Sequence, residues 1–113
     1  MKSKIVALSK NQDFKNLLKG RKISNKYSIV YYGKLSYKNN KKLNISFVVK
    51  KKIGNAVKRN RIKRRLKNIM NDANKTLNLN LRYSYLLIAR SAVLKDSYEI
   101  IKQNLFTDFG KIK

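Results

Sequence analysis

The chain has 113 residues, enough for one domain with one modest hydrophobic core, and we expect no second catalytic domain within this length. Twenty-nine Lys and Arg residues stand against five acids, and the net charge of +24 indicates a polyanionic partner, either a nucleic acid or an anionic membrane surface. No apolar run approaches the roughly 18 residues that a spanning helix needs, and the run at 5–8 is too short for a signal peptide. Cys and His are both absent, which fits a cytoplasmic protein that contacts no membrane and has no thiol or imidazole chemistry.

The first predicted element is a short helix at about 12–19. Asn11 is a suitable N-cap, and Asp13 lies favourably in the first turn. Gly20 can end the helix in the left-handed conformation. Its apolar side consists of Phe14, Leu17 and Leu18.

Two strands with a period of two follow the first helix. Apolar and aromatic residues alternate over 27–37 and again over 43–49, with a polar turn at 38–41 between them. This pattern predicts a β-hairpin. Ile23 and its neighbours indicate a short additional strand.

The second half of the chain predicts helix, strand and helix. A helix over about 56–73 is indicated by an apolar stripe at Ile62, Leu66, Ile69 and Ala73. The segment 83–90 is apolar on both faces at its middle, as a central strand would be. The last helix, at about 97–109, has Asp96 and Glu99 as a capping box and a buried side formed by Ile101, Leu105 and Phe109.

The order α-β-β-β-α-β-α predicts an α+β fold with helices packed on a small mixed sheet of four strands. We expect one RNA-binding domain over 1–113, with basic flexible termini at 1–9 and 110–113. The strands at 43–50 and 83–90 form a βαβ unit with the long helix, and the general rule makes such a crossover right-handed. The pattern leaves open which sheet face packs against the core.

The long helix carries an unusual concentration of positive charge. Ten of the eighteen residues in 50–67 are Lys or Arg, and no acid occurs in 50–70. Four of the seven Arg residues fall within 59–65, so a general bias toward Lys does not explain the cluster. These charges repel one another unless a phosphate backbone neutralises them. RNA is favoured over DNA because the chain has no helix-turn-helix, zinc-finger or zipper pattern.

The basic segment KKIGNAVKRNRIKRRLKN, at 51–68, resembles the signature of the bacterial ribonuclease P protein family, including its Arg-Asn-Arg core at 59–61. NQDFKNLLKG at 11–20 resembles the first helix of the family. YSIVYYGKL at 27–35 and YLLIAR at 85–90 resemble two of its strands. The resemblance therefore covers most of the chain in the family's order.

The resemblance implies an accessory subunit of a ribonucleoprotein endoribonuclease. A partner RNA would hold the catalytic Mg²⁺ ions, and the protein would help it bind precursor tRNA and remove the 5′ leader. It also implies a left-handed βαβ crossover, against the general rule. The implied contacts with the RNA subunit are Lys52, Asn55, Arg59, Asn60, Arg61, Lys63, Arg64 and Lys67. The implied cleft for the single-stranded leader consists of Phe14, Leu18, Tyr31, Val48, Lys50 and Arg90.

Three residues depart from the family pattern. Leu18 stands where a second aromatic residue is common, which weakens base stacking at that position. Lys58 and Arg65 add charge at positions that are often apolar. The aromatic residues Phe14 and Tyr31 also fit an ordinary role in a hydrophobic core.

No catalytic residue or metal ligand is expected in the chain itself. A metal-dependent nuclease needs converging carboxylates, and a metal-free one normally uses His. The acids are spread along the chain, at Asp13, Asp72, Asp96, Glu99 and Asp108.

Two alternatives to the ribonuclease P subunit are a structural RNA-binding protein of the ribosomal type and a cationic membrane-active protein. The membrane-active protein is disfavoured because the apolar stripe of the basic helix is narrow.

Overall fold

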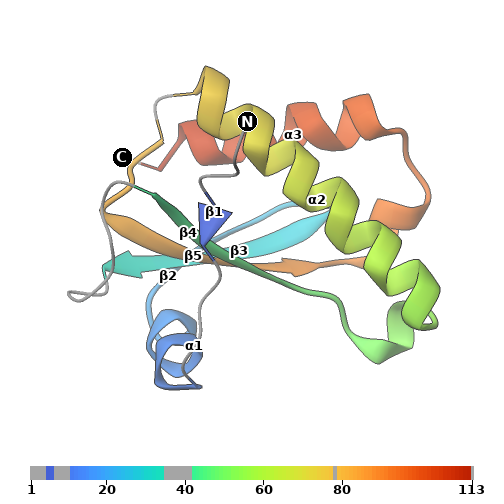
Figure 1. Ribbon diagram of the computed structural model, residues 1–113, viewed down its shortest axis with the longest axis horizontal. Coiled ribbons are helices and arrows are strands. Elements are labelled where there is room, and N and C mark those ends of the chain that lie inside the picture. The colour runs from blue at the N-terminus through green and yellow to red at the C-terminus, as the bar shows by residue number, and fades with distance from the viewer. Residues whose placement is uncertain (1–4, 7–10, 35–41, 78, 113) are drawn as a thin grey trace.

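The computed structural model describes residues 5–6, 11–34, 42–77 and 79–112 (Figure 1). The predicted order of helices and strands is confirmed, with one short strand added before the first helix and two 3-10 helices. The elements are β1 (Ile5–Val6), α1 (Asn11–Leu18), β2 (Arg21–Ser24), β3 (Ser28–Lys34), β4 (Leu43–Val48), η1 (Lys51–Ile53), α2 (Ala56–Thr76), β5 (Tyr83–Ala89), η2 (Ser91–Leu94) and α3 (Tyr98–Gly110).

The strands form one mixed sheet in the order β1-β4-β5-β3-β2. β5 is central, as predicted, and pairs in parallel with β4 and antiparallel with β3. The predicted hairpin is therefore wrong, because β5 separates its two strands. Alternation shows which residues share a face, but it does not show which strands are neighbours. The predicted turn at 38–41 lies outside the described residues.

The β4-α2-β5 unit has a left-handed crossover, as the family resemblance implies and against the general rule. In Figure 1, α2 lies above the sheet, β4 lies nearer the viewer than β5, and both strands run from left to right. Passing from β4 over the sheet through α2 to β5 therefore turns in the left-handed sense. The same view shows α2 and α3 on one face of the sheet and α1 on the other.

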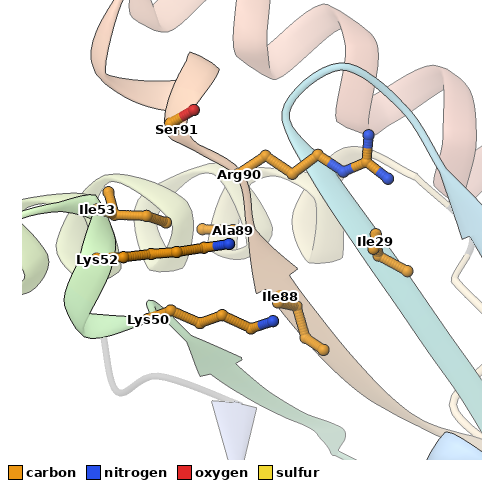
Figure 2. Close-up of a pocket in the computed structure, with 8 residues that line it drawn as sticks. All are labelled: Ile29, Lys50, Lys52, Ile53, Ile88, Ala89, Arg90 and Ser91. Carbon is orange, nitrogen blue, oxygen red and sulfur yellow. The ribbon is translucent and has the colours of Figure 1, made fainter.

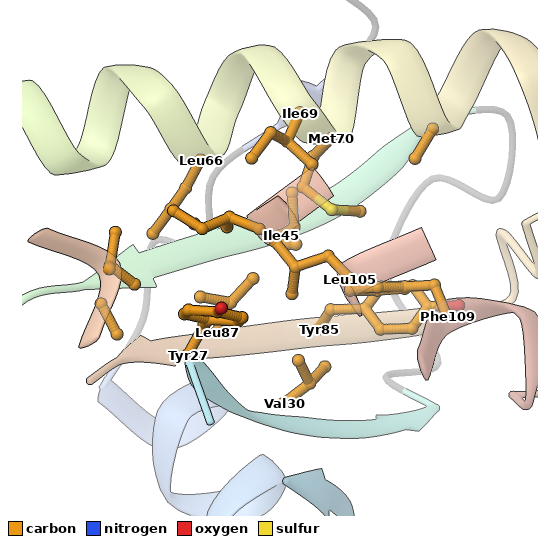
Figure 3. Close-up of a cluster of buried hydrophobic side chains, with 14 of the residues drawn as sticks. Tyr27, Val30, Ile45, Leu66, Ile69, Met70, Tyr85, Leu87, Leu105 and Phe109 are labelled. Atoms are coloured by element: carbon orange, nitrogen blue, oxygen red, sulfur yellow. The ribbon is translucent and has the colours of Figure 1, made fainter. Parts of the chain in front are cut away.

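The main hydrophobic core lies between the sheet and the two long helices (Figure 3). The predicted stripe of α2 is buried, and Met70 joins it. Each fully buried aliphatic side chain of this kind stabilises the fold by roughly 1.5–3 kcal/mol. The sheet contributes Leu43 and Ile45 from β4 and Tyr85 and Leu87 from β5. Helix α3 contributes the predicted residues Ile101, Leu105 and Phe109.

A smaller cluster lies on the opposite face, under α1. Leu17 and Leu86 are buried there. Because side chains alternate along a strand, Leu86 and Leu87 point to opposite faces of β5. The face that carries Leu87 packs against the core, and the face that carries Leu86 lies toward α1, which answers the question left open by the sequence.

Two predicted helix boundaries need correction. No described residue has a φ in the left-handed region, so Gly20 does not end α1 in the left-handed conformation. Its N–H donates to the Leu17 carbonyl oxygen at 3.0 Å, and a Cβ at this position would lie 3.2 Å from the Tyr32 carbonyl oxygen. A side chain at this position would therefore crowd the backbone of β3, and glycine allows the close approach of the two backbones.

The second correction concerns the start of α3. Ser97 is the N-cap, and its side chain accepts a hydrogen bond from the Ile100 N–H. Asp96 therefore does not cap the helix, although Glu99 lies in the first turn. The Asp96 carboxylate instead accepts a hydrogen bond from the Tyr27 hydroxyl. It also pairs with Lys26, with 3.2 Å between the Lys26 Nζ and the Asp96 Oδ2. A tertiary partner for Asp96 thus leaves capping to the next polar residue.

Parts of both termini that were predicted to be flexible, 1–9 and 110–113, belong to the folded unit. Ile5 and Val6 pair in parallel with β4, and the side chain of Ile112 is buried against the core. Helix α1 begins at Asn11, one residue earlier than predicted. None of the described helices combines the length and the hydropathy needed to cross a membrane.

Candidate nucleic-acid interface

Helix α2 presents the predicted basic face. The Asn55 side chain caps the helix by accepting a hydrogen bond from the Lys58 N–H at 2.9 Å. Because the apolar stripe packs on the sheet, the opposite side of the helix is left in solvent. No acid occurs on α2 before Asp72. The exposed residues of this face are Lys58, Asn60, Arg61, Lys63, Arg64 and Lys67.

Two arginines lie at the margins of this face and are half-buried. The Nε atom of Arg59 is buried and has no hydrogen-bond partner among the described residues. The Arg65 Nη1 donates to the Val93 carbonyl oxygen at 3.4 Å, which ties α2 to η2. The position of Arg65 therefore has a structural contact that the sequence did not indicate.

A basic pocket of about 460 Å³ lies where β4, η1 and β5 end. Figure 2 shows the side chains of Lys50 and Lys52 extending in the same direction toward β5, while the Arg90 guanidinium lies near the strand that carries Ile29. No acid lines the pocket, so it attracts anions. Its lining residues are Ile29, Lys50, Lys52, Ile53, Ile88, Ala89, Arg90 and Ser91.

The pocket adjoins the cluster under α1. Phe14, Tyr31 and Val48 are half-buried members of that cluster, together with Ile88, which also lines the basic pocket. The Lys22 Nζ lies 5.9 Å from the centre of the Tyr31 ring, within the range of a cation–π contact. Aromatic faces, aliphatic side chains and cations thus follow one another along this side of the sheet.

The structure does not gather every residue predicted for the cleft. It brings Phe14, Tyr31 and Val48 into the α1 cluster, and Lys50 and Arg90 into the adjoining pocket. Leu18 is 48% exposed and belongs to neither, because Leu17 occupies the side of α1 that packs on the sheet.

Other placements were not anticipated from the sequence. Lys52, assigned by resemblance to the RNA-subunit surface, lines the pocket beside Lys50. Ile88 was missed, although it alternates with Leu86 and Arg90 along the same strand face. The positions of Lys22 and Ser91 had no signal in the sequence, because only the folded chain brings them to this surface.

Several acids are engaged in contacts within the fold. Asp72 pairs with Lys102 at 3.3 Å, and the Asp108 carboxylate accepts a hydrogen bond from the Asn25 side chain. The hydrogen bond from Tyr27 and the nearby Lys26 hold the pKa of Asp96 below its usual value. The part of the chain that the structure describes contains no group of three or more side chains arranged to hold a metal ion.

A family model described as Ribonuclease P matches residues 3–113 of the chain. The chain belongs to the ribonuclease P protein family. It is 39% identical over 102 residues to the ribonuclease P protein component of Carboxydothermus hydrogenoformans, covering 87% of this chain and 83% of that protein. It is also 35% identical over 111 residues to the component from Mesomycoplasma hyopneumoniae, covering 97% and 95%.

Solved ribonuclease P proteins have the same fold. The RNase P protein of Staphylococcus aureus superposes with a TM-score of 0.76 at 26% identity, covering 90% of each chain. The protein from Thermotoga maritima superposes with a TM-score of 0.80 over 96% of this chain and 98% of that chain, at 21% identity. The arrangement of three helices on a mixed sheet is therefore that of the family.

Proposed function

We propose that this chain is the protein subunit of a ribonuclease P, and that it assists a catalytic RNA in removing the 5′ leader from precursor tRNA. The observation that carries the proposal is the exposed, acid-free basic face of α2, which is built from the family's signature segment. Such a face is stabilised by contact with a polyanion, because phosphates neutralise the repulsion among its Lys and Arg side chains and binding releases counterions.

The basic face of α2 is the proposed contact with the RNA subunit. Its guanidinium groups suit bidentate contacts with phosphate, and its location on one rigid helix suits recognition of the shape of a folded RNA. Arg59 lies half-buried at the margin of this face. Asn55 caps the helix and holds the first turn in place. The proposed contacts are Asn55, Arg59, Asn60, Arg61, Lys63, Arg64 and Lys67.

The α1 cluster and the basic pocket are the proposed site for the leader. Half-buried Phe14 and Tyr31 offer ring faces on which unpaired bases stack without regard to sequence. Lys50, Lys52 and Arg90 lie in the adjoining pocket, where they neutralise the phosphates of the same strand. The continuity of the two sites through Ile88 supports a path for a single strand.

The proposal assigns the chemical step to the RNA subunit, with Mg²⁺ held mainly by RNA. In the protein, Asp72, Asp96 and Asp108 are already engaged with Lys102, Tyr27 and Asn25. This distribution of acids supports a binding role for the chain. We propose that the hydrolytic ribonucleoprotein acts in the cytoplasm. Its substrate would be precursor tRNA.

One assay tests the function directly. The purified protein is added to a candidate catalytic RNA and a precursor tRNA with a 5′ extension, at a low Mg²⁺ concentration. We expect protein-dependent cleavage at the mature 5′ end. Protein alone and RNA alone serve as controls. Binding to the RNA without stimulation of cleavage would instead favour a structural RNA-binding protein.

The contact with the RNA subunit predicts the effect of two substitutions. Arg59→Ala and Arg61→Ala each weaken affinity for that RNA by roughly 1–3 kcal/mol, the range of a charge-assisted contact. Arg82→Ala is the matched control, because it removes the same charge from an exposed site outside α2. A filter-binding titration at fixed salt measures all three. Wild-type affinity after both α2 substitutions would contradict the assignment.

A further inference from the structure

A second hollow in the surface lies between α2 and α3, with a volume of about 420 Å³. We call it the arginine groove. The predicted contacts with the RNA subunit do not include Arg65, Asn68 or Tyr98. No acid lines the groove. Its lining residues are Arg61, Arg64, Arg65 and Asn68 from α2, and Tyr98 from α3.

The arginine side chains of this groove differ in burial and in how firmly they are held. Arg65 is half-buried and held by the Val93 carbonyl oxygen, so its charge has a defined position. Arg61 and Arg64 are exposed and lie on adjacent turns of the helix surface. The charges of the three arginines that line the hollow repel one another, and a single phosphate entering the hollow relieves that repulsion.

Tyr98 supplies a neutral aromatic surface beside these charges. It is the first residue of α3, it is half-buried, and part of it packs against the main core. Its hydroxyl lies 3.4 Å from a carboxylate oxygen of Asp72, which also pairs with Lys102. These contacts anchor the ring at both ends. Burial, with the Asp72 charge, raises the pKa of the Tyr98 phenol, so the ring stays uncharged near neutral pH.

We propose that the arginine groove binds one unpaired nucleotide of the RNA subunit, with its phosphate against Arg61 and Arg64 and its base stacked on Tyr98. The Asn68 amide, which can both donate and accept hydrogen bonds, lies in reach of a base edge in the same hollow. This inference rests on the proposed function. It extends the RNA interface from α2 to α3.

The aromatic ring of Tyr98 favours an unpaired nucleotide over a double helix as the ligand of the groove. A duplex presents phosphates and sugars to a basic helix and keeps its base faces stacked inside, so a tyrosine ring gains little from it. An unpaired nucleotide offers both a phosphate and an open base face. Arginine and tyrosine side by side match both parts.

The test compares three variants by affinity for the RNA subunit. Tyr98→Leu keeps apolar packing but removes the stacking face, and we expect binding about 5-fold to 100-fold weaker. Tyr98→Phe keeps the ring and stays within about twofold of wild type. Tyr83→Leu removes a half-buried tyrosine from β5, outside the groove, and binds like wild type. Circular dichroism at the binding temperature shows that each variant is folded.

The salt dependence of binding separates stacking from charge. Tyr98→Leu leaves the slope of log affinity against log salt unchanged, because a stacked base releases no counterion. Arg64→Gln reduces that slope by about one, as expected for one lost phosphate contact. If Tyr98→Leu reduced the slope of log affinity against log salt, the substitution would have rearranged the charged surface. The proposal that a base stacks on Tyr98 would then be wrong.

The remaining outcomes also decide the proposal. If wild-type protein binds the RNA subunit and Tyr98→Leu binds it equally well, the groove inference is wrong while the proposed function stands. If Tyr98→Leu instead weakens only the binding of precursor tRNA to the assembled complex, the groove takes substrate and the inference is also wrong. If wild-type protein neither binds the RNA nor stimulates cleavage, both proposals fail together.

Discussion

Asp96 joins two segments that lie far apart in the chain. Its carboxylate accepts a hydrogen bond from Tyr27, just before β3, and pairs with Lys26, so the start of α3 is tied to the sheet. The Tyr27 hydrogen bond, with Lys26, lowers the pKa of Asp96, and the Asp96 hydrogen bond raises the pKa of Tyr27. The paired state therefore requires an ionised Asp96 and a protonated Tyr27.

This pairing makes stability depend on pH. A carboxyl whose pKa is lower in the folded than in the unfolded state contributes stability above its unfolded value, near 4, and loses it as the pH falls through the folded value. Asp96→Asn should therefore be less stable than wild type at neutral pH, with a difference that shrinks below about pH 4. Urea unfolding across this range measures it, with Glu99→Gln as the control. A difference that is constant with pH would contradict the argument.

Phe14 is the residue that best tests the proposed leader site. Phe14→Ala removes a half-buried ring from the α1 cluster and should weaken binding of precursor tRNA by roughly 1–3 kcal/mol, leaving mature tRNA unaffected, because only the precursor has a leader to stack. Binding of both tRNAs to the assembled complex measures this. Leu18→Ala, on the exposed side of α1, should have a smaller effect. Equal losses for both tRNAs would place Phe14 in a purely structural role.

Helix α2 combines two opposite demands along one element. Its buried stripe holds it on the sheet, while its exposed face carries charges that repel one another. Packing and the Asn55 cap must therefore hold the first turn against this repulsion. The first turn of α2 contains no acidic side chain, which would interact favourably with the positive end of the helix dipole.

The cap of α2 can be separated from RNA binding. Asn55→Ala should lower the free energy of unfolding by about 1 kcal/mol, whereas Asn55→Ser, which can accept the same hydrogen bond, should retain most of it. Urea unfolding measures both variants. If Asn55 also contacts the RNA subunit, the Ser variant keeps its stability and loses affinity. Equal destabilisation by Ala and Ser would show that the capping hydrogen bond is not the source of the lost stability.

At the scale of the whole molecule, the net charge of +24 opposes the compact state. Added salt screens this repulsion, because the screening length falls from about 14 Å to about 4 Å between roughly 0.05 and 0.5 M ionic strength. The temperature of the unfolding midpoint should therefore rise over that range. Differential scanning calorimetry measures the shift. Arg61→Gln combined with Arg64→Gln should respond less to salt, and a midpoint independent of salt would contradict the prediction.

Local patterns in the sequence predicted the elements well. The spacing of Ile62, Leu66, Ile69 and Ala73 identified the buried side of α2, because helix geometry alone places these residues on one stripe. The two apolar faces of β5 indicated its central position for a similar reason. The basic face of α2 followed from the same geometry. These features depend on neighbours within one element.

Features that join distant segments escaped prediction. The hairpin was wrong because strand partners are chosen by the whole sheet, and β5 arrives from much later in the chain. Asp96 was misread as a cap because its partner, Tyr27, is distant in sequence. Leu17 and Leu18 both fit the apolar side of a short helix, and only packing against the sheet distinguished them.

The sequence by itself determined the main helices and strands, the stripe that α2 buries and the charge that it exposes, because these depend on periods of two and 3.6 residues and on residue chemistry. Resemblance to the family supplied the left-handed crossover. Only the tertiary structure decided the order of the strands, the meeting of Lys50, Lys52 and Arg90 in one pocket, and the placement of Tyr98 beside the arginines of α2. These depend on contacts between segments far apart in the chain, which local pattern does not encode.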